Sequence, residues 1–195
     1  MKERAASIET KTNETVIRVS VNLDGTGKHE VSTGTKFLDH MISSFSTHSL
    51  IDVEVRASGD LTHHIVEDTA IALGKCISDA LGDRSGIRRF GTAFVPMDES
   101  LAFASIDLVK RRYFVASNIE IKRDFVEDLP REDALHFFSS FCDSLLCTMH
   151  VKIEHGSNDH HKIEACFKAV AIAMRAAVEK DPRRVESVPS SKGAM

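Results

Sequence analysis

His63-His64-Ile65-Val66-Glu67 and His160-His161-Lys162-Ile163-Glu164 share one form, two adjacent histidines with a glutamate three residues after the second. Each stretch opens a segment with helical periodicity. On a helix, residues four apart share a face, so we expect His63 under Glu67 and His160 under Glu164. His64 and His161 then point about 100° away from their neighbours. Each copy can therefore offer side chains in two directions.

The repeat extends upstream of the doublets. His40 precedes His63 by 23 residues and His136 precedes His160 by 24, which also aligns Ser43-Ser44-Phe45 with Ser139-Ser140-Phe141. This alignment indicates an internal duplication of roughly a hundred residues, and a repeat of that length decides the fold. We predict a first half over 1–90, a second half over 91–185 and a C-terminal tail over 186–195.

Both halves follow the same order of elements. Alternating β-branched residues predict strands, and turn residues such as Asp24-Gly25-Thr26-Gly27 separate them. In the first half we predict strands at 15–23, 28–33 and 51–57, the 28–33 segment returning from that turn, and helices at 37–48 and 65–81. In the second half we predict strands at 92–95, 101–108 and 147–154, a further candidate strand at 113–117, and helices at 133–146 and 163–179; the segment 118–129 is ambiguous. The pattern predicts an α+β protein of duplicated strand-strand-helix-strand-helix halves, each a mixed sheet with helices on one face, packed through a common face.

Composition limits the function classes. The chain has 195 residues, 42% apolar and 28% charged, and its net charge of −4 provides no basic field for nucleic acid. It has no apolar run long enough for a membrane helix, and Met1-Lys2-Glu3-Arg4 lacks an apolar signal core, so we expect a cytoplasmic protein. The four cysteines have no CxxC spacing, which favours buried thiols over disulfides or a thiolate metal site.

Six of the ten histidines occupy repeat positions. A lone histidine is usually a satisfied core or surface residue, an interpretation that suits His29, His150 and His155. Six histidines and two glutamates placed by a duplication instead indicate metal binding, and imidazole with carboxylate suits divalent manganese, iron or zinc. One partition consistent with the repeat puts His63, Glu67, His136 and His161 on one ion and His160, Glu164, His40 and His64 on the other. The symmetry does not fix which neighbour reaches which ion, or whether all ligands come from one chain.

Six motifs, in order along nearly the whole chain, resemble those of the imidazoleglycerol-phosphate dehydratase family. They are Phe37-Leu38-Asp39-His40-Met41, His63-His64-Ile65-Val66-Glu67-Asp68, Gly86-Ile87-Arg88-Arg89-Phe90-Gly91, Val95-Pro96-Met97-Asp98-Glu99, His136-Phe137-Phe138 and Asn158-Asp159-His160-His161-Lys162-Ile163-Glu164. The resemblance implies a duplicated fold of the ribosomal protein S5 domain 2-like kind and two Mn²⁺ ions per active site. It also implies trimers that assemble into a 24-subunit octahedral shell, with sites between subunits.

The resemblance further implies a reaction of histidine biosynthesis, the loss of water from imidazole glycerol phosphate to give imidazole acetol phosphate. The carbon that loses its proton has no carbonyl beside it, so the imidazole ring is the only electron sink. Two metals on the ring nitrogens would favour an imidazolate form of the substrate, which is Lewis-acid and templating catalysis. A proton-transfer pair must still act, and the candidates are Glu14, His48, Glu67 and Glu164.

Residue-by-residue similarity to the family also suggests substrate contacts. The family's phosphate-binding residues match Arg89, Arg111, Lys168, Ser190 and Lys192. The family's other substrate contacts match Glu14 and His48. The tail would then close on the substrate phosphate, whereas its composition alone predicts a frayed terminus.

Two departures from the family pattern stand out. Gly59-Asp60-Leu61-Thr62 leads straight into His63 where the family usually has two aspartates, so we expect no carboxylate to orient a histidine there. Ser44 stands where the family tends to have glutamine, and one phosphate contact would be lost or mediated by water.

Two other functions would use the same residues. A dinuclear metallohydrolase would activate water with these ligands, but bridging aspartates are not evident at the repeat positions. Alternatively, the metals could be purely structural and clamp subunits together. Metal chelation with separate assays of size and activity discriminates among the three.

Overall fold

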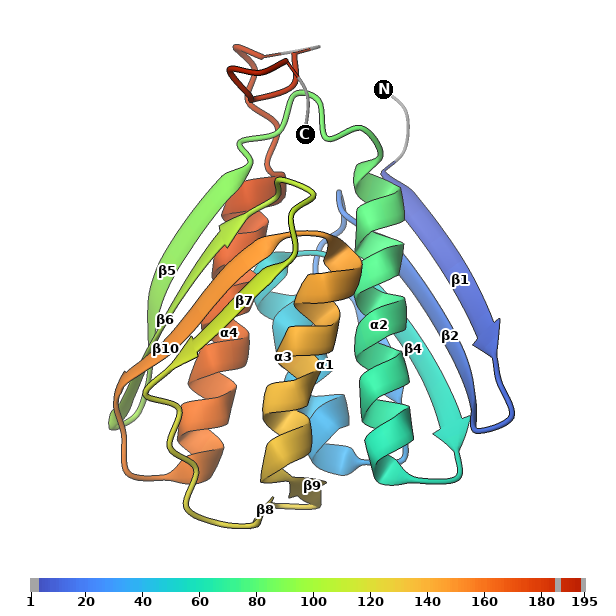
Figure 1. The fold of residues 1–195 in the computed structure, drawn as a ribbon, viewed down its shortest axis with the longest axis vertical. Coiled ribbons are helices and arrows are strands. Elements are labelled where there is room, and N and C mark those ends of the chain that lie inside the picture. The colour runs from blue at the N-terminus through green and yellow to red at the C-terminus, as the bar shows by residue number, and fades with distance from the viewer. Residues whose placement is uncertain (1–3, 185–186, 194–195) are drawn as a thin grey trace.

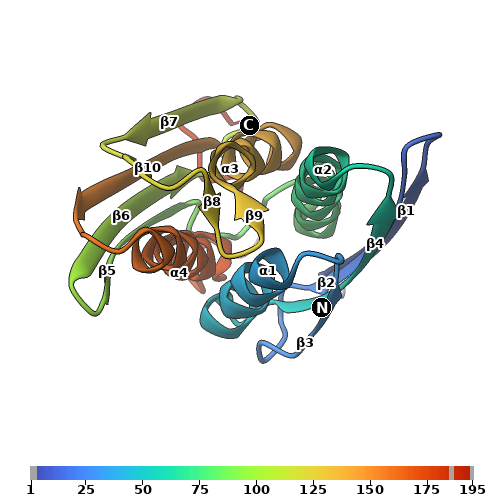
Figure 2. The same cartoon turned by 90° about the horizontal axis from the view of Figure 1, so that it is seen from below.

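The computed structural model describes residues 4–184 and 187–193; the first three residues and the expected boundary at 185/186 lie outside them. Two four-stranded sheets form the outside of the molecule, and four helices lie between them (Figures 1 and 2). The α+β class and the duplicated halves are confirmed. In chain order the elements are β1 (Ala5–Lys11), β2 (Thr15–Asn22), β3 (His29–Ser32), α1 (Lys36–Ser49), β4 (Asp52–Gly59), α2 (Thr62–Leu81), β5 (Phe90–Met97), β6 (Ser100–Asp107), β7 (Tyr113–Ser117), β8 (Phe125–Val126), β9 (Leu129–Pro130), α3 (Arg131–Leu145), β10 (Thr148–His155) and α4 (Asp159–Val178).

The two sheets have equivalent strand orders, β1-β2-β4-β3 and β5-β6-β10-β7. In each sheet the last strand is parallel to its neighbour and the other pairs are antiparallel, so both sheets are mixed. Each half places three strands of its four-stranded sheet before its first helix rather than two. The additional first strand, β1, is an edge strand. The candidate strand at 113–117 is confirmed as β7, and the ambiguous segment contains β8 of a short hairpin that has no counterpart among the described residues of the first half.

One predicted pairing is wrong. The segment 28–33 does not return beside β2, because β4 occupies that position and pairs with β2 along its whole length. The strand formed there, β3, instead lies parallel to β4 on its other side. The side chain of Asp52 organises the crossover, since its Oδ1 accepts hydrogen bonds of 2.8 Å from the backbone N–H groups of Thr26 and Lys28.

The core is shared between the halves. In the long helices both predicted apolar stripes are buried, Ala70, Leu73, Ile77 and Leu81 on α2 and Phe167, Val170, Met174 and Val178 on α4. Helix α2 packs against α3, and α1 packs against α4, so each helix pair joins one half to the other. All four helices begin at the same end of the molecule, the lower end in Figure 1. This arrangement brings the first turns of helices from both halves together.

The join between the halves is fixed by a buried arginine. Arg84 is 0% exposed, and its guanidinium donates to the carbonyls of Leu145 (2.6 Å) and Leu146 (2.8 Å), at the end of α3. All four cysteines are free and buried, as expected. Among the described residues, no helix has the length and apolar character needed to cross a bilayer.

Candidate metal centre

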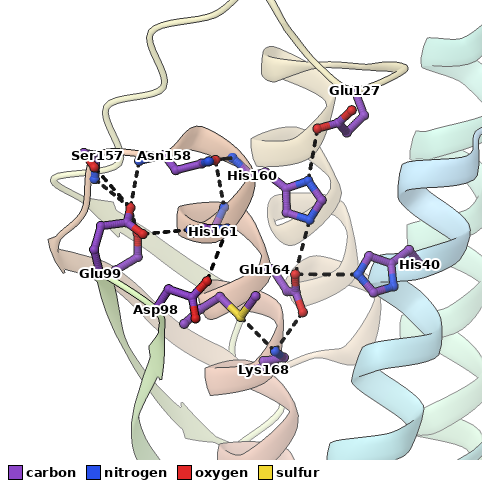
Figure 3. Close-up of polar contacts among 12 residues, drawn as sticks. His40, Asp98, Glu99, Glu127, Ser157, Asn158, His160, His161, Glu164 and Lys168 are labelled. Carbon is purple, nitrogen blue, oxygen red and sulfur yellow. Dashed lines mark hydrogen bonds and ion pairs between the residues drawn. The ribbon is translucent and has the colours of Figure 1, made fainter.

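Each half supplies the main part of one three-residue cluster of possible metal ligands. His63 and Glu67 lie on α2, and His136 of α3 completes their cluster; the Nε2 atoms of His63 and His136 lie 3.8 and 3.1 Å from the Glu67 carboxylate. We call this the α2–α3 cluster. Its repeat counterpart, the α1–α4 cluster, contains His160, Glu164 and His40 (Figure 3).

The α1–α4 cluster has the same geometry. The Nε2 atoms of His160 and His40 lie 3.3 and 3.6 Å from Oε2 of Glu164. In both clusters one ligand atom from each residue lies within 4.8 Å of the other two. Ligand atoms at about 2.0 to 2.2 Å from one ion stand roughly 3 to 4 Å apart, so either set fits a single divalent cation.

Helix geometry and loop contacts place the doublets. The i and i+4 positions of one helix place each glutamate on the same face as its histidine, as predicted. At the start of α4 the Asn158 side chain accepts hydrogen bonds from the backbone N–H groups of His160 and His161, which caps the helix. Glu99 holds this turn from the β5–β6 loop, because its Oε1 accepts from the backbone N–H groups of Ser157 and Asn158.

A carboxylate lies at Nδ1 of every doublet histidine. The partners are Asp133 for His63 (2.6 Å), Asp60 for His64 (2.8 Å), Glu127 for His160 (3.1 Å) and Glu99 for His161 (2.7 Å). A carboxylate only accepts hydrogen bonds, so in each neutral imidazole Nδ1 carries the proton and Nε2 keeps its lone pair for a metal.

The expectation that no carboxylate orients a histidine before the first doublet is therefore wrong. Asp60 itself reaches His64 because the two are four residues apart, and Asp133 reaches His63 from the first turn of α3. The Asp133 side chain is 3% exposed and sits where α3 packs against α2. The segment before His63 therefore supplies one carboxylate itself, and tertiary packing supplies the other.

These contacts shift the pKa values of the imidazoles. The hydrogen bond that His63 donates to Asp133 raises the pKa of His63, and those to Asp60 and Glu99 do the same for His64 and His161. Burial would raise the pKa of Glu164, but the hydrogen bond and charge of Lys168, with the nearby histidines, lower it overall. Glu164 is therefore ionised at neutral pH, as a metal ligand must be.

His64 and His161 belong to neither cluster within one chain. Figure 3 shows His161 turned toward Glu99, with its Nε2 3.7 Å from Asp98, while His160 faces Glu164. His64 likewise faces Asp60 and, at 3.8 Å, Glu14. The members of each doublet diverge as the helix geometry predicts. Three members of each predicted ligand set are brought together, and the fourth points away from the chain's own clusters.

Two of the expected substrate contacts flank the α1–α4 cluster. Lys168 Nζ lies 2.7 Å from Oε1 of Glu164 and 3.2 Å from Sδ of Met97. His48 of α1 lies nearby, and burial, followed by the charge of Lys168, lowers its pKa. The repeat counterpart of Lys168 is Ile71, so this basic flank exists only in the second half.

The remaining expected phosphate contacts lie at the other end of the molecule. Arg89 makes two hydrogen bonds to the Asp107 carboxylate, at 2.6 and 2.9 Å, and a third of 2.7 Å to the carbonyl of Pro189. Arg111 is exposed in the loop after β6. The tail with Ser190 and Lys192 lies at the top of Figure 1, opposite the first turns of the helices.

The tail is not the frayed end that its composition predicts. Pro189 is buried, and the carbonyl of Ser187 accepts a 3.0 Å hydrogen bond from the backbone N–H of Gly86. Together with Arg89, these contacts hold the segment against the join between the halves. Composition missed them because the partners are distant in sequence.

Ser44 is buried rather than open to solvent as a phosphate ligand would be. Its side chain is 7% exposed on α1, and its Oγ has no hydrogen-bond partner among the described residues.

A hollow of about 660 Å³ lies on the outer face of the first sheet, near Ser20 and Glu54, rather than at either cluster. One chain alone therefore does not gather all the expected site residues.

Comparison with known proteins finds one family along most of the chain. Residues 33–174 match the family model described as imidazoleglycerol-phosphate dehydratase. A protein of that name from Granulibacter bethesdensis is 48% identical over 195 residues, covering 98% of this chain and 99% of the relative. One from Chlorobaculum parvum is 49% identical over 98% of this chain and 100% of the relative.

Solved structures are similar to this chain as well. The crystal structure of imidazoleglycerol-phosphate dehydratase from Staphylococcus aureus has a TM-score of 0.83 and 29% identity, covering 91% of this chain and 99% of that one. The Pyrococcus furiosus enzyme, solved in complex with (S)-C348, has a TM-score of 0.82 and 31% identity, covering 96% of this chain and 100% of that one.

Proposed function

The chain belongs to the imidazoleglycerol-phosphate dehydratase family, and we propose that it converts imidazole glycerol phosphate to imidazole acetol phosphate at sites that each hold two Mn²⁺ ions. Family membership makes it an enzyme of histidine biosynthesis and a carbon–oxygen hydro-lyase. The manganese centre, the division of the site between subunits and the cytoplasmic location are parts of the proposal.

One observation carries the metal centre. Two clusters of two histidines and a glutamate, related by the internal duplication, present their Nε2 atoms around a carboxylate. In the doublets every Nδ1 is occupied by a carboxylate, which leaves Nε2 as the ligand atom. Borderline-hard donors of this kind suit manganese, iron or zinc, and the family resemblance favours manganese.

The metals would act as Lewis acids that stabilise an imidazolate form of the substrate. The chain's own residues must then move protons. His48 suits a base, because burial lowers its pKa and keeps the ring neutral at neutral pH. Glu14 is a second candidate, since its carboxylate is exposed beside His64. Glu67 and Glu164 remain candidates as well as ligands, and positioned proton transfer contributes about 10²- to 10⁴-fold.

The phosphate would be bound by Arg89, Arg111, Lys168, Ser190 and Lys192. Arg89 has five N–H donors and uses three on Asp107 and Pro189, which leaves two for a phosphate oxygen. Because the tail and the helix starts lie at opposite ends of one chain, we propose that each site combines residues of different subunits. His64 and His161, which point away from their own clusters, are the ligands that a second subunit would receive.

Such shared sites would make assembly depend on metal. We propose trimers that join into a 24-subunit particle, and metal that binds between subunits favours the assembled state by mass action. A dinuclear metallohydrolase is the alternative enzyme, but both clusters consist of histidine and glutamate without an aspartate that bridges them among the described residues. Purely structural metals are the other alternative.

Chelation discriminates among these functions. Stripping the metal should reduce the particle to a smaller oligomer, with trimers expected, and abolish dehydratase activity; restoring Mn²⁺ should recover both. Light scattering reports mass, and atomic absorption confirms metal loss. Recovery of mass without activity would favour structural metals, whereas an unchanged mass after confirmed metal loss would contradict the shared sites.

A further inference from the structure

We infer that Glu127 is a positioning residue for the candidate ligand His160, and that it supplies the carboxylate that the repeat counterpart of Asp133, Phe37, cannot supply. The inference rests on the proposed metal centre and assigns a role to a residue outside the repeat.

The first observation is a break in the repeat symmetry. Asp133, in the first turn of α3, hydrogen-bonds Nδ1 of His63. The alignment that pairs His136 with His40 pairs Asp133 with Phe37, in the first turn of α1. Phe37 cannot accept a hydrogen bond; its ring instead contacts the His160 ring, with centroids 4.8 Å apart. The repeat alone would leave Nδ1 of His160 without a carboxylate.

The second observation is the origin of the replacement. Glu127 lies at the tip of the β8–β9 hairpin, which has no counterpart within residues 4–90, and its Oε1 lies 3.1 Å from Nδ1 of His160 (Figure 3). The adjacent Asp128 accepts hydrogen bonds from the backbone N–H groups of Lys36 (2.6 Å) and Phe37 (2.9 Å) at the start of α1. The hairpin tip therefore contacts both helices of the α1–α4 cluster.

The third observation is the backbone conformation. Glu127 has φ = 56°, in the left-handed region, which is unfavourable for a residue with a Cβ. Glycine would adopt this conformation without strain. A glutamate kept there at a cost to stability is consistent with a function for its side chain, because such strain concentrates at functional sites.

Together these contacts fix the ring of His160. Phe37 limits its tilt, and Glu127 keeps the proton on Nδ1 so that Nε2 faces Glu164. Carboxylates of this kind typically change metal affinity by about 10- to 100-fold when they are removed.

The test uses Glu127→Gly, Glu127→Gln and the control Asp124→Asn in the full-length protein. Glycine removes both the carboxylate and the backbone strain, glutamine keeps an acceptor oxygen, and Asp124→Asn removes a charge from the same loop, where the side chain is 85% exposed and does not contact His160. Each metal-stripped variant is titrated with Mn²⁺ by calorimetry, and its melting temperature is measured without metal.

We expect Glu127→Gly to weaken Mn²⁺ binding about 10- to 100-fold at one of two classes of site. Its metal-free melting temperature should rise, by about 2 to 4 °C for relief of the strain. Glu127→Gln should retain most of the affinity, and Asp124→Asn should change neither quantity. Weaker Mn²⁺ binding combined with a higher metal-free melting temperature separates a positioning role from a structural role.

Unchanged Mn²⁺ affinity in Glu127→Gly would overturn the inference while leaving the metal centre intact. A fall in melting temperature that accompanies the loss of affinity would also overturn it, in favour of a structural role for the hairpin. If the parent protein itself bound no Mn²⁺, the metal centre would fail and the role of Glu127 with it.

Discussion

Replacing Gly74 by alanine should damage one cluster and spare the other. Gly74 lies on α2 where the backbone of α3 approaches closely: a Cβ there would lie 2.5 Å from the carbonyl oxygen of Phe141 and 2.9 Å from the backbone nitrogen of Leu145. Ordinary contact needs about 3.4 Å or more, so α2 and α3 must separate by nearly 1 Å. These helices carry His63, Glu67 and His136, whereas the α1–α4 cluster is on other elements.

The expected losses of stability and metal affinity in Gly74→Ala follow from this clash. Overpacking of a core typically costs about 1 to 3 kcal/mol. Metal sites tolerate changes of only a few tenths of an ångström in ligand distance. We therefore expect Gly74→Ala to lower the melting temperature and to weaken one class of Mn²⁺ site at least about tenfold, or 1.4 kcal/mol, with the second class unchanged.

Calorimetric titration of the metal-stripped protein measures this change directly. Gly82→Ala is the matched control: Gly82 ends α2 with φ = 59° and nothing lies within 4 Å of its Cβ position, so alanine there costs about 1 to 3 kcal/mol of stability without a clash. Two unchanged classes of site in Gly74→Ala, alongside the expected loss of stability, would refute the dependence of the α2–α3 cluster on helix spacing.

Three further predictions concern the ligands, the tail and pH. His64→Ala and His161→Ala should each abolish turnover and lower metal content, because each removes an expected ligand; full metal content with normal turnover would contradict the site. Truncation after Val188 should lower kcat/KM about ten- to a hundredfold for each lost phosphate contact, and it also removes the carbonyl that Arg89 binds; wild-type kcat/KM at physiological ionic strength would remove the tail from the site. Burial opposes ionisation of Asp52, but three backbone N–H groups lower its pKa below its usual 3.8, so its stabilisation is present above that pH and lost as pH falls through the folded-state pKa. The difference in unfolding free energy between the parent and Asp52→Asn, measured by denaturant titration, should therefore close in acid; a constant difference would contradict the shift.

The sequence predicted the parts of the fold that depend on local pattern. Helical spacing placed Glu67 on the same face as His63 and Glu164 on the same face as His160, and both contacts are present. The edge strand β1 escaped notice because Ile8 is its only large apolar residue. The pairing of β3 was missed because strand order depends on tertiary contacts rather than on the turn that precedes the strand.

Site residues that depend on tertiary contacts could not be predicted from the local pattern either. The duplication indicated the six histidines and two glutamates, and the structure brings six of these eight residues into two clusters. Asp133 and Glu127 were missed because each reaches its histidine across the packed interior or from a hairpin, at separations of 70 and 33 residues. Asp60 had a local signal, its position four residues before His64, which could have identified it.

The central claim is tested most directly by incubating the manganese-loaded protein with imidazole glycerol phosphate and following the formation of imidazole acetol phosphate. The account predicts stoichiometric loss of water with turnover that disappears on chelation and returns with Mn²⁺. A fully assembled, fully metal-loaded protein that leaves the substrate unchanged would contradict it.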